Sequence, residues 1–471
     1  MVNLYYKHQL IPAPSPYGGD SLSSSTSKLF AGALGVTGGL AALRFLAGQI
    51  AKQGVKVIMT DPYSENLAEL LSATKRTGVQ TILETNLRAQ RAQVLKRPLG
   101  SPRRFLDFDG LMFVSAHLDR EALPHTIPVD VTTTIGPRSK RPLTVGTPLF
   151  ISGMAYKKAL SARAKYALAL GSRLAGTVSN TGEGPFLPKE RELADRLIVQ
   201  YPRLPLHRTL DMLAQADALE IQLGQGASAG GAQVPFPHLV FPELPPVRAS
   251  SDLPKVVRFL KQAGGGVPVG VKFSFTNNLE REIDLCLEAE VDFLALEGAK
   301  AGTVAAPPIL LDDFGLPTIM GLCRAVEHLK TRGVYGQVSL IVSGGFFSPG
   351  QCLKALALGA NAIYLGTMPL YAMSHTQTTK SIPWEPPTQL VVDGGKQSRR
   401  FNWKLGAKHL ANYLISCTEE IKEGVRALGK HALHEVDLTD LVALDEVTSQ
   451  VTGVPLAYAK RTVRALVPSR G

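Results

Sequence analysis

Two glycine-ended stretches of the sequence could bind an anion. The apolar run 339–345 ends in Ser-Gly-Gly, and the apolar run 362–367 ends in Gly-Thr. Backbone N–H groups that no side chain obstructs can converge on a phosphate, and the N-terminus of a following helix adds favourable partial charge. The alternative is that these glycines only permit tight turns.

A lysine in an apolar run is the second group that could do chemistry. Lys272 is the one lysine of the run 267–273, VPVGVKF. A lysine that faces inward there has to be paired or used, because burying an unpaired ammonium is costly. The alternative is a lysine that reaches out into solvent at the end of a strand.

Two glycine-containing loops carry further polar groups. The sequence SNTGEGPF places Asn180, Thr181 and Glu183 between glycines. The sequence EIQLGQGASAGGAQ places Gln222 and Gln225 at the start of a glycine-rich loop. Neither loop is diagnostic alone, but together they predict a polar pocket for a ring or a small acid.

The elements that would position these groups form a regular pattern from residue 148 onward. Short apolar runs alternate with amphipathic stretches, which is typical of parallel strands joined by crossover helices. The expected strands are 148–154, 176–180, 196–201, 218–223, 267–273, 293–298, 339–345 and 362–367. The expected helices include 161–171, 207–215, 252–263, 279–290, 318–331 and 349–358. Eight such units predict an α/β fold, a TIM (β/α)8 barrel. A doubly wound open sheet is the alternative, but no G-x-G-x-x-G follows the first strand.

A barrel places its chemistry at the carboxyl ends of its strands, which turns the strand list into a list of candidate site residues. These are Ser152, Gly153, Met154, Asn180, Gln200, Gln222, Lys272, Glu297, Ser343, Gly344, Gly345, Gly366 and Thr367. Barrels frequently bind phosphate after strands seven and eight, which is where the two glycine-ended runs fall. We therefore expect a phosphate there.

The remaining segments are expected to be appendages of the barrel. We expect a disordered tail at 1–27, an apolar helix at 28–50, an N-terminal elaboration at 51–145, the barrel at 146–375, and a loop or lid with a C-terminal helical extension at 376–471. A long amphipathic helix is expected at 405–428 within that extension.

The apolar segment 29–50 has about the length of a bilayer span, yet it contains Arg44 and several glycines. Association with a membrane through this segment and a helix packed on the domain both stay open. The basic residues Lys52 and Lys56 that follow it would keep the main body cytoplasmic, at the inner face of the membrane if the segment inserts.

Composition narrows the function classes. The net charge of +12 is spread over basic stretches without aromatic interleaving, so attraction for small anions is favoured over nucleic-acid binding. Four cysteines, at 286, 323, 352 and 417, lie far apart and form no ligand motif. The sequence therefore predicts neither a metal site nor a cysteine-ligated iron–sulfur cluster.

Several of these segments, in one order over roughly 150–430, resemble the FMN-binding synthase domain of glutamate synthase in its stand-alone form. They are ISGMAYKKALSARAKYALALG, SNTGEGPF, ADALEIQLGQGASAGGAQ, GVKF, GLPTIMGLCRAVEHL, SGGFFSPGQCLKALALGANAIYLGTMPL and AKHLANYLISCTEEIKEGVRALG. The most specific matches are SNTGEG and the last two strands.

The resemblance implies a barrel that holds FMN, with the phosphate on strands seven and eight and the ring near residues 152–155, Gln222 and Lys272. The implied cofactor-binding residues are Ser152, Gly153, Met154, Ala155, Asn180, Thr181, Gln200, Gln222, Lys272, Gly302, Thr303, Ser343, Gly344, Gly345, Gly366 and Thr367. The implied catalytic and substrate-contacting residues are Lys272, Glu183, Gln225, Glu297 and Lys300. Lys272 would support the reduced flavin.

The chain also departs from the family pattern. The cysteine triple of a 3Fe–4S cluster follows the last strand in large glutamate synthases, whereas this chain reads LYAMSHTQTTKSIPW there. The glycine-rich HDGGTGASP-like loop is replaced by EGAKAGTVAAPP, which puts Glu297 and Lys300 in place of the acidic pair. No glutaminase-type cysteine occurs before residue 286.

The expected function is that of an FMN-dependent oxidoreductase that reductively aminates 2-oxoglutarate or a related 2-oxo acid. Ammonia or an amine would come from outside, with a separate electron donor or amidotransferase as partner. Two alternatives stay open: a flavoenzyme acting on another amino or 2-oxo acid, and a non-catalytic FMN-binding redox protein. A third, a phosphate-ligand barrel without flavin, lacks a catalytic group at the barrel mouth.

Overall fold

The computed structural model describes residues 25–66, 68–115, 117–118, 120–205, 208–226, 244–303 and 306–459. The chain divides into two compact units, residues 1–93 and residues 94–471. The segment 51–145, predicted as one N-terminal elaboration, is thus split between the two units.

The first unit is helical. It contains α1 (Ser25–Thr60), α2 (Glu69–Thr77) and α3 (Val79–Arg91). The apolar helix predicted at 28–50 lies inside α1, which continues for ten residues beyond the predicted end. The predicted tail at 1–27 is wrong in its last three residues, which begin α1, and its first 24 lie outside the described residues. Across the part of the chain that the structure describes, no helix combines the length and hydropathy of a membrane span.

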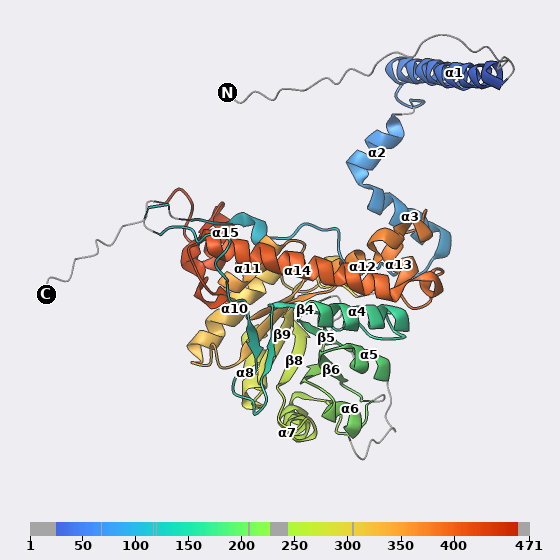
Figure 1. Cartoon of the computed structure of the whole chain (residues 1–471). Helices are drawn as coiled ribbons and strands as arrows, with labels where there is room; N and C mark the ends of the chain where they lie inside the picture. The colour runs from blue at the N-terminus through green and yellow to red at the C-terminus, as the bar shows by residue number, and fades with distance from the viewer. Residues whose placement is uncertain are drawn as a thin grey trace, which may run out of the picture. The chain divides into compact units, whose positions relative to one another are not determined.

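The second unit is built on eight parallel strands, and its helices surround them (Figure 1). The strands are β4 (Leu149–Ile151), β5 (Val178–Asn180), β6 (Arg196–Pro202), β7 (Ala218–Gln222), β8 (Val269–Ser274), β9 (Phe293–Glu297), β10 (Ser339–Ser343) and β11 (Ala362–Leu365). Each of the eight predicted strands is present.

The strands pair in the order β4-β11-β10-β9-β8-β7-β6-β5, and every pair is parallel. β4 and β5, the strands at the two ends of this order, are joined by hydrogen bonds between residues beside them. Thr177 donates through Oγ1 to the carbonyl of Leu149 at 2.6 Å, and the N–H of Gly146 donates to the carbonyl of Gly176 at 2.9 Å. The sheet is therefore a nearly closed barrel, and the predicted TIM-barrel fold is confirmed.

The helices of this unit are α4 (Ala162–Leu174), α5 (Pro188–Leu193), α6 (Leu210–Ala214), α7 (Leu253–Ala263), α8 (Leu279–Glu288), α9 (Pro308–Asp312), α10 (Thr318–Thr331), α11 (Pro349–Ala357), α12 (Thr367–Ser374), α13 (Pro386–Leu390), α14 (Trp403–Ala427) and α15 (Glu446–Thr452). The long helix α14 packs along α4, where a Cβ on Gly171 would lie 2.7 Å from the Leu410 side chain. Glycine at 171 therefore lets the two helices approach closely.

Two small sheets complete the unit. The hairpin of β2 (Thr133–Ile135) and β3 (Leu143–Val145) shares a hydrophobic cluster with the inner residues of the barrel. Its link to the start of β10 is a hydrogen bond from the Gly136 N–H to Ser339 Oγ at 3.0 Å. The hairpin therefore closes the amino-terminal end of the barrel. Elsewhere, β1 (Leu111–Phe113) pairs antiparallel with β12 (Leu441–Ala443).

The stretch after the last strand is not the long loop or lid that the sequence predicted. It forms α12, the 3-10 turn at His375–Lys380, α13 and the 3-10 turn at Ser398–Arg400. The buried amide of Gln377 fastens it to the start of α14, because it accepts from the N–H of Asn402 at 2.7 Å and donates to the Asn402 carbonyl at 3.0 Å. The prediction failed because these helices are too short to show a helical periodicity in the sequence.

The barrel interior is layered by the alternation of side chains along each strand. The lower layer is apolar and contains Phe150, Val178, Ile198, Ala218, Phe293, Ile341 and Ala362. Gly270 lies among them, and a Cβ there would come within 2.4 Å of the Phe293 ring. The layer above, toward the carboxyl ends of the strands, is polar.

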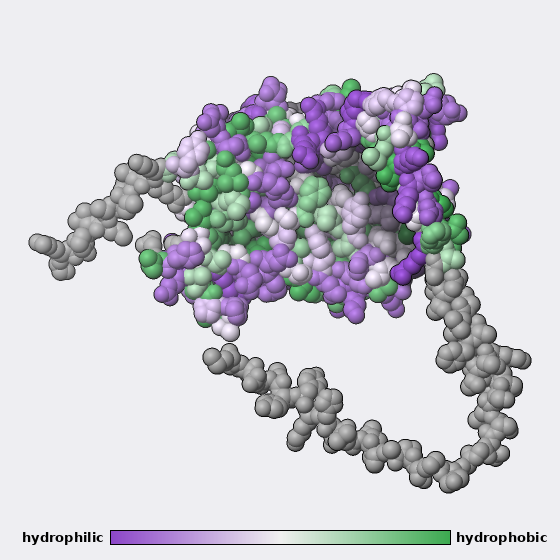
Figure 2. Space-filling view, turned by 90° about the horizontal axis from the view of Figure 1, so that it is seen from above, coloured by the Kyte–Doolittle hydropathy of each residue, from purple (hydrophilic) through white to green (hydrophobic). Residues whose placement is uncertain are grey.

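On the outside, hydrophilic and hydrophobic residues are interspersed, with hydrophilic ones along the edge of the view (Figure 2).

Candidate active site

Lys272 faces the barrel interior and carries a charge there. Its side chain is 1% exposed, and its Nζ lies 2.8 Å from Glu297 Oε1 and 3.5 Å from Ser152 Oγ. Burial disfavours the charged ammonium, but Glu297 and Glu220 outweigh it and raise the pKa of Lys272 above its ordinary value. The predicted inward orientation has its reason in strand alternation: Val271 and Phe273 point to the helices, so Lys272 points to the axis.

Glu220 is the second buried carboxyl group of the polar layer, beside Glu297, and it was not predicted from the sequence. Its Oε1 accepts from Asn180 Nδ2 at 3.0 Å and from Gln200 Nε2 at 2.7 Å. Its Oε2 accepts from the Tyr364 hydroxyl at 2.7 Å. Burial and this carboxylate raise the pKa of Tyr364 well above its ordinary value, so the hydroxyl stays a donor. A glutamate inside the apolar run ALEIQL could have indicated this inward-facing group, just as the lysine in VPVGVKF indicated Lys272.

The loop after β5 is fastened by a buried cationic cluster. Arg208, 5% exposed, donates to the carbonyls of Gln200, Gly182 and Gly184 at 2.7, 2.8 and 2.7 Å. Burial lowers the pKa of Arg208 to about 10. Lys165 lies 3.0 Å from Glu190 and donates to the Asn180 carbonyl at 2.7 Å. These contacts fix the SNTGEG backbone, and neither Arg208 nor Lys165 was singled out from the sequence.

The same loop packs on the end of β4. A Cβ on Gly182 would come within 2.5 Å of the Ala155 nitrogen, and one on Gly153 would come within 2.8 Å of Gln200 Nε2. Glycines at these places let the loop and the Ser152–Ala155 segment lie against each other. Glu183 is half-buried on this loop and contributes to the raised pKa of Lys272.

The loop after β7 reaches Glu297 from another side. The N–H of Gly226 donates to Glu297 Oε2 at 3.1 Å, and Gln225 directly precedes this glycine. Gln222 lies within the polar layer, where it accepts from Gln200 at 3.3 Å. The structure thus brings together most of the predicted ring-binding and substrate-contacting residues at one end of the barrel.

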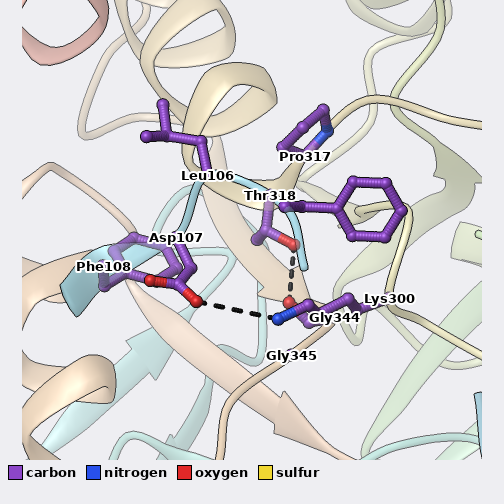
Figure 3. Close-up of a pocket in the computed structure, with 9 residues that line it drawn as sticks. Leu106, Asp107, Phe108, Lys300, Pro317, Thr318, Gly344 and Gly345 are labelled. Atoms are coloured by element: carbon purple, nitrogen blue, oxygen red, sulfur yellow. Dashed lines mark hydrogen bonds and ion pairs between the residues drawn. The ribbon is translucent and has the colours of Figure 1, made fainter. Parts of the chain in front are cut away.

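Both glycine-ended strands lie at the same end, and the two glycines after β10 line a small pocket (Figure 3). Gly344 and Gly345 have φ of 112° and 84°, a conformation that favours glycine, and the Gly344 carbonyl accepts from Thr318 Oγ1 at 2.6 Å. A Cβ on Gly366 would meet no atom within 4 Å, and Thr367 is the first residue of α12. The backbone at the end of β11 is therefore open to a bound group, whereas Thr318 and Lys300 lie against Gly344 and Gly345 at the end of β10.

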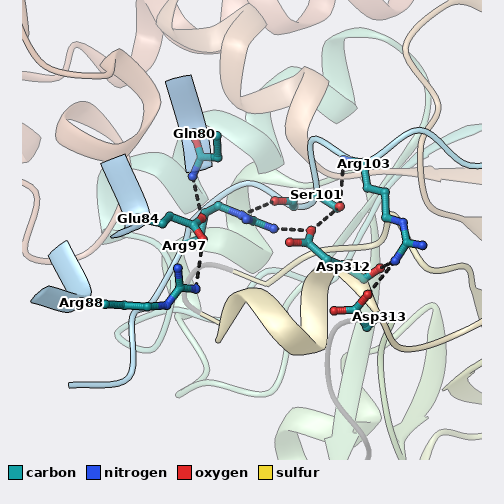
Figure 4. A network of polar contacts seen from close by, with 9 residues as sticks. Gln80, Glu84, Arg88, Arg97, Ser101, Arg103, Asp312 and Asp313 are labelled. Carbon is teal, nitrogen blue, oxygen red and sulfur yellow. Dashed lines mark hydrogen bonds and ion pairs between the residues drawn. The ribbon is translucent and has the colours of Figure 1, made fainter. Parts of the chain in front are cut away.

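The loop after β9 is held by a segment of chain from outside the barrel. We call residues 97–108 the strap. The strap is anchored on α9 by Arg97 and Ser101, which both contact the Asp312 carboxylate, and by Arg103, which lies 2.6 Å from Asp313 (Figure 4). A Cβ on Gly302 would come within 2.6 Å of the Gly100 backbone. Gly302, next to Thr303, thus lies against the strap, and Gly344 and Gly345 share a pocket with strap residues 105–108.

The residues at this end of the barrel fit FMN. The open backbone at Gly366 suits a phosphate, because no side chain keeps it from the N–H group. Gly344 and Gly345 turn the chain at the neighbouring strand end through a conformation that favours glycine. The polar layer offers a ring one buried cation and neutral amides from Gln200 and Gln222. Each of the four cysteines lies on a different helix, and burial raises the pKa of Cys286 and Cys323 to about 12, so neither of these two thiols is activated.

Comparison with known proteins gives the family. The conserved region of glutamate synthase matches residues 114–251 and 242–431. A glutamate synthase large subunit-like protein of Rhizobium meliloti is 29% identical over 400 residues, which is 77% of this chain and 90% of that protein. The archaeal glutamate synthase [NADPH] of Archaeoglobus fulgidus is 30% identical over 328 residues, 65% of this chain and 63% of that protein.

An archaeal-type glutamate synthase [NADPH] of Thermotoga neapolitana is 31% identical over 332 residues, 65% of this chain and 64% of that protein. The chain thus spans about two thirds of the length of the archaeal-type relatives. Among solved structures, flavocytochrome b2 with benzoylformate is similar with a TM-score of 0.47 and 17% identity, over 77% of this chain and 82% of that one. Because the family match covers more than half of the chain, this protein belongs to the glutamate synthase family.

Proposed function

We propose that this protein is an FMN-dependent oxidoreductase of the glutamate synthase type that reductively aminates a 2-oxo acid, with 2-oxoglutarate as the first candidate. The observation that carries the proposal is the buried, charged Lys272 in a polar layer next to two glycine-ended strands. Burying a cation at the mouth of a barrel is costly unless the cation has an anionic partner, and here Glu297 is that partner.

The roles of the residues follow from where they lie. FMN, when bound, would supply the hydride-transfer chemistry. Residues Gly344, Gly345 and Gly366 would hold its phosphate through the backbone. Lys272 would place positive charge beside the ring, and Gln200 and Gln222 would hydrogen-bond its edge.

The substrate would be held by the groups on the surrounding loops. Glu183 on the β5 loop and Gln225 on the β7 loop are proposed to contact the amino acid or imino acid. Glu297 lies between the β7 loop and Lys272, and it is proposed to contact the substrate as well. A separate electron donor and an external source of ammonia or amine complete the proposed reaction.

The experiment is an absorption spectrum followed by anaerobic turnover. The purified protein should show oxidised-flavin bands and release FMN on denaturation. The reduced protein should then be reoxidised by 2-oxoglutarate with ammonia under anaerobic conditions. A colourless protein that takes up no FMN would refute the proposal.

A second candidate is a flavoenzyme acting on a different 2-oxo acid. It is favoured by the loop after β9, where Glu297 and Lys300 replace the acidic pair of the family pattern. Reoxidation by other 2-oxo acids, but not by 2-oxoglutarate, would select this candidate and leave the cofactor assignment intact.

A further inference from the structure

Lys300 lies against the glycine pair at the end of β10. A Cβ on Gly345 would come within 2.7 Å of Lys300 Cδ and 3.2 Å of its Cβ. The stem of Lys300 therefore crosses the position that a side chain at 345 would fill. Lys300 is also the cation among the nine residues that line the pocket, and Figure 3 shows it beside Gly344 and Gly345.

The ammonium of Lys300 is only loosely held. Its Nζ lies 3.6 Å from Asp107 Oδ2 and 5.9 Å from the centre of the Phe347 ring. Charge-assisted hydrogen bonds are normally about 2.7–2.9 Å long, so this pair is a long one. Both side chains are partly exposed, at 18% for Lys300 and 31% for Asp107, which weakens their attraction further. An anion of higher charge could therefore replace Asp107 as the partner.

The strap determines where Asp107 sits. Its anchor on α9 fixes residues 97–103, and Phe108 stacks on Phe346 with ring centres 5.1 Å apart. The other Asp107 oxygen accepts from the N–H of Asp109 at 3.0 Å. Asp107 is therefore held in place from its own side, while Lys300 has the freedom of its four-carbon stem.

We propose that Lys300 binds the phosphate of the flavin and that Asp107 competes with this phosphate for the ammonium. This inference rests on the proposed FMN function. It replaces the substrate-contacting role predicted for Lys300, because Lys300 lies on the glycines of β10 whereas Lys272 and Glu297 face the barrel axis. A side chain on the loop after β9 would thus add a charged ligand to a backbone phosphate site.

The test compares FMN with riboflavin, which has the same ring and no phosphate. Apoprotein is titrated with each ligand and the quenching of flavin fluorescence gives the Kd. Lys300→Met should weaken FMN binding about ten-fold or more, as expected for a lost bond to a charged group, and leave riboflavin binding unchanged. Asp107→Asn should tighten FMN binding, and this gain should vanish in the double variant Lys300→Met/Asp107→Asn.

A matched control is Lys330→Met. Lys330 also lies over an aromatic ring, that of Tyr335 at 5.1 Å, but it is in the last turn of α10, at the opposite end of the barrel. This variant should bind both ligands like the wild type. The control also shows whether loss of one positive charge, by itself, changes FMN affinity.

Each outcome decides something. FMN binding that is unchanged in Lys300→Met would overturn the inference and leave the proposed function standing. Unchanged FMN binding with a raised KM for the 2-oxo acid would assign Lys300 to the substrate carboxylate and overturn the inference as well. Wild-type protein that binds neither flavin would overturn both the inference and the proposed function.

Discussion

Replacing Lys272 by methionine should destabilise the barrel, because it leaves Glu297 and Glu220 buried without their cation. Lys272 Nζ and Glu297 Oε1 are 2.8 Å apart, and their side chains are 1% and 5% exposed. At an effective dielectric constant of about 20, such a pair attracts by about 6 kcal/mol, most of which is offset by the cost of removing both ions from water. Removing one partner forfeits the attraction and keeps the cost, so we expect a loss of roughly 3–5 kcal/mol.

The assay is chemical unfolding followed by tryptophan fluorescence, since both tryptophans, Trp384 and Trp403, belong to the unit that contains the barrel. The double variant Lys272→Met/Glu297→Gln should recover part of the loss, because it removes the unpaired carboxylate. Lys422→Met is the matched control: its pair with Glu419 is 2.7 Å long but 25% and 55% exposed, so its loss should stay below about 1 kcal/mol.

Two results would refute this reasoning. A loss in Lys272→Met as small as that in the control would mean that the pair is not desolvated. Strict additivity in the double variant would mean that the two groups do not interact. In the flavin-loaded protein, the same substitution should slow flavin reduction more than it weakens FMN binding, and unchanged reduction would remove the role proposed for Lys272.

Three further changes test the scaffold. Gly270→Ala should lower the thermal midpoint and cost about 1–3 kcal/mol of stability, because its methyl group would meet the Phe293 ring at 2.4 Å. Adding Phe293→Leu should restore part of this loss. An unchanged midpoint would contradict the tight packing. Asp312→Asn should loosen the strap and speed proteolytic cleavage within 97–108; the same cleavage rate as the wild type would show that this anchor does not hold it. Burial disfavours the charged carboxylate of Asp284, but hydrogen bonds from Arg332 and His328 outweigh this effect and lower the pKa of Asp284. Asp284 therefore stabilises the fold fully above pH about 4, and this stabilisation fades as the pH falls through the depressed pKa. Asp284→Asn should therefore lower the midpoint at pH 7 and converge with the wild type in acid, and a constant difference would contradict this.

The sequence alone determined the barrel and the positions of its strand ends. Eight apolar runs separated by amphipathic stretches leave few folds open, because parallel strands need crossover helices that cover them. The same periodicity located Lys272, Glu297 and the two glycine-ended strands at one end of the barrel. These are local patterns, and local patterns are what a sequence displays directly.

Only the tertiary structure decided which residues contact each other. Glu220 binds Asn180, Gln200 and Tyr364 from three other strands, and nothing in the spacing of these residues along the chain indicates that they meet. The segment after the last strand was predicted as a loop, because its short helices depend on packing against neighbouring segments, such as α12 on α14, and show no periodicity of their own.

The strap shows the same limit at larger distance. Its contacts join residues about 200 positions apart, such as Arg103 with Asp313 and Lys300 with Asp107. Long-range pairing of charges depends on how the chain returns to the barrel, and that is a property of the whole fold. The sequence thus supplied candidate residues for chemistry, and the packing of distant segments decided which of them lie together.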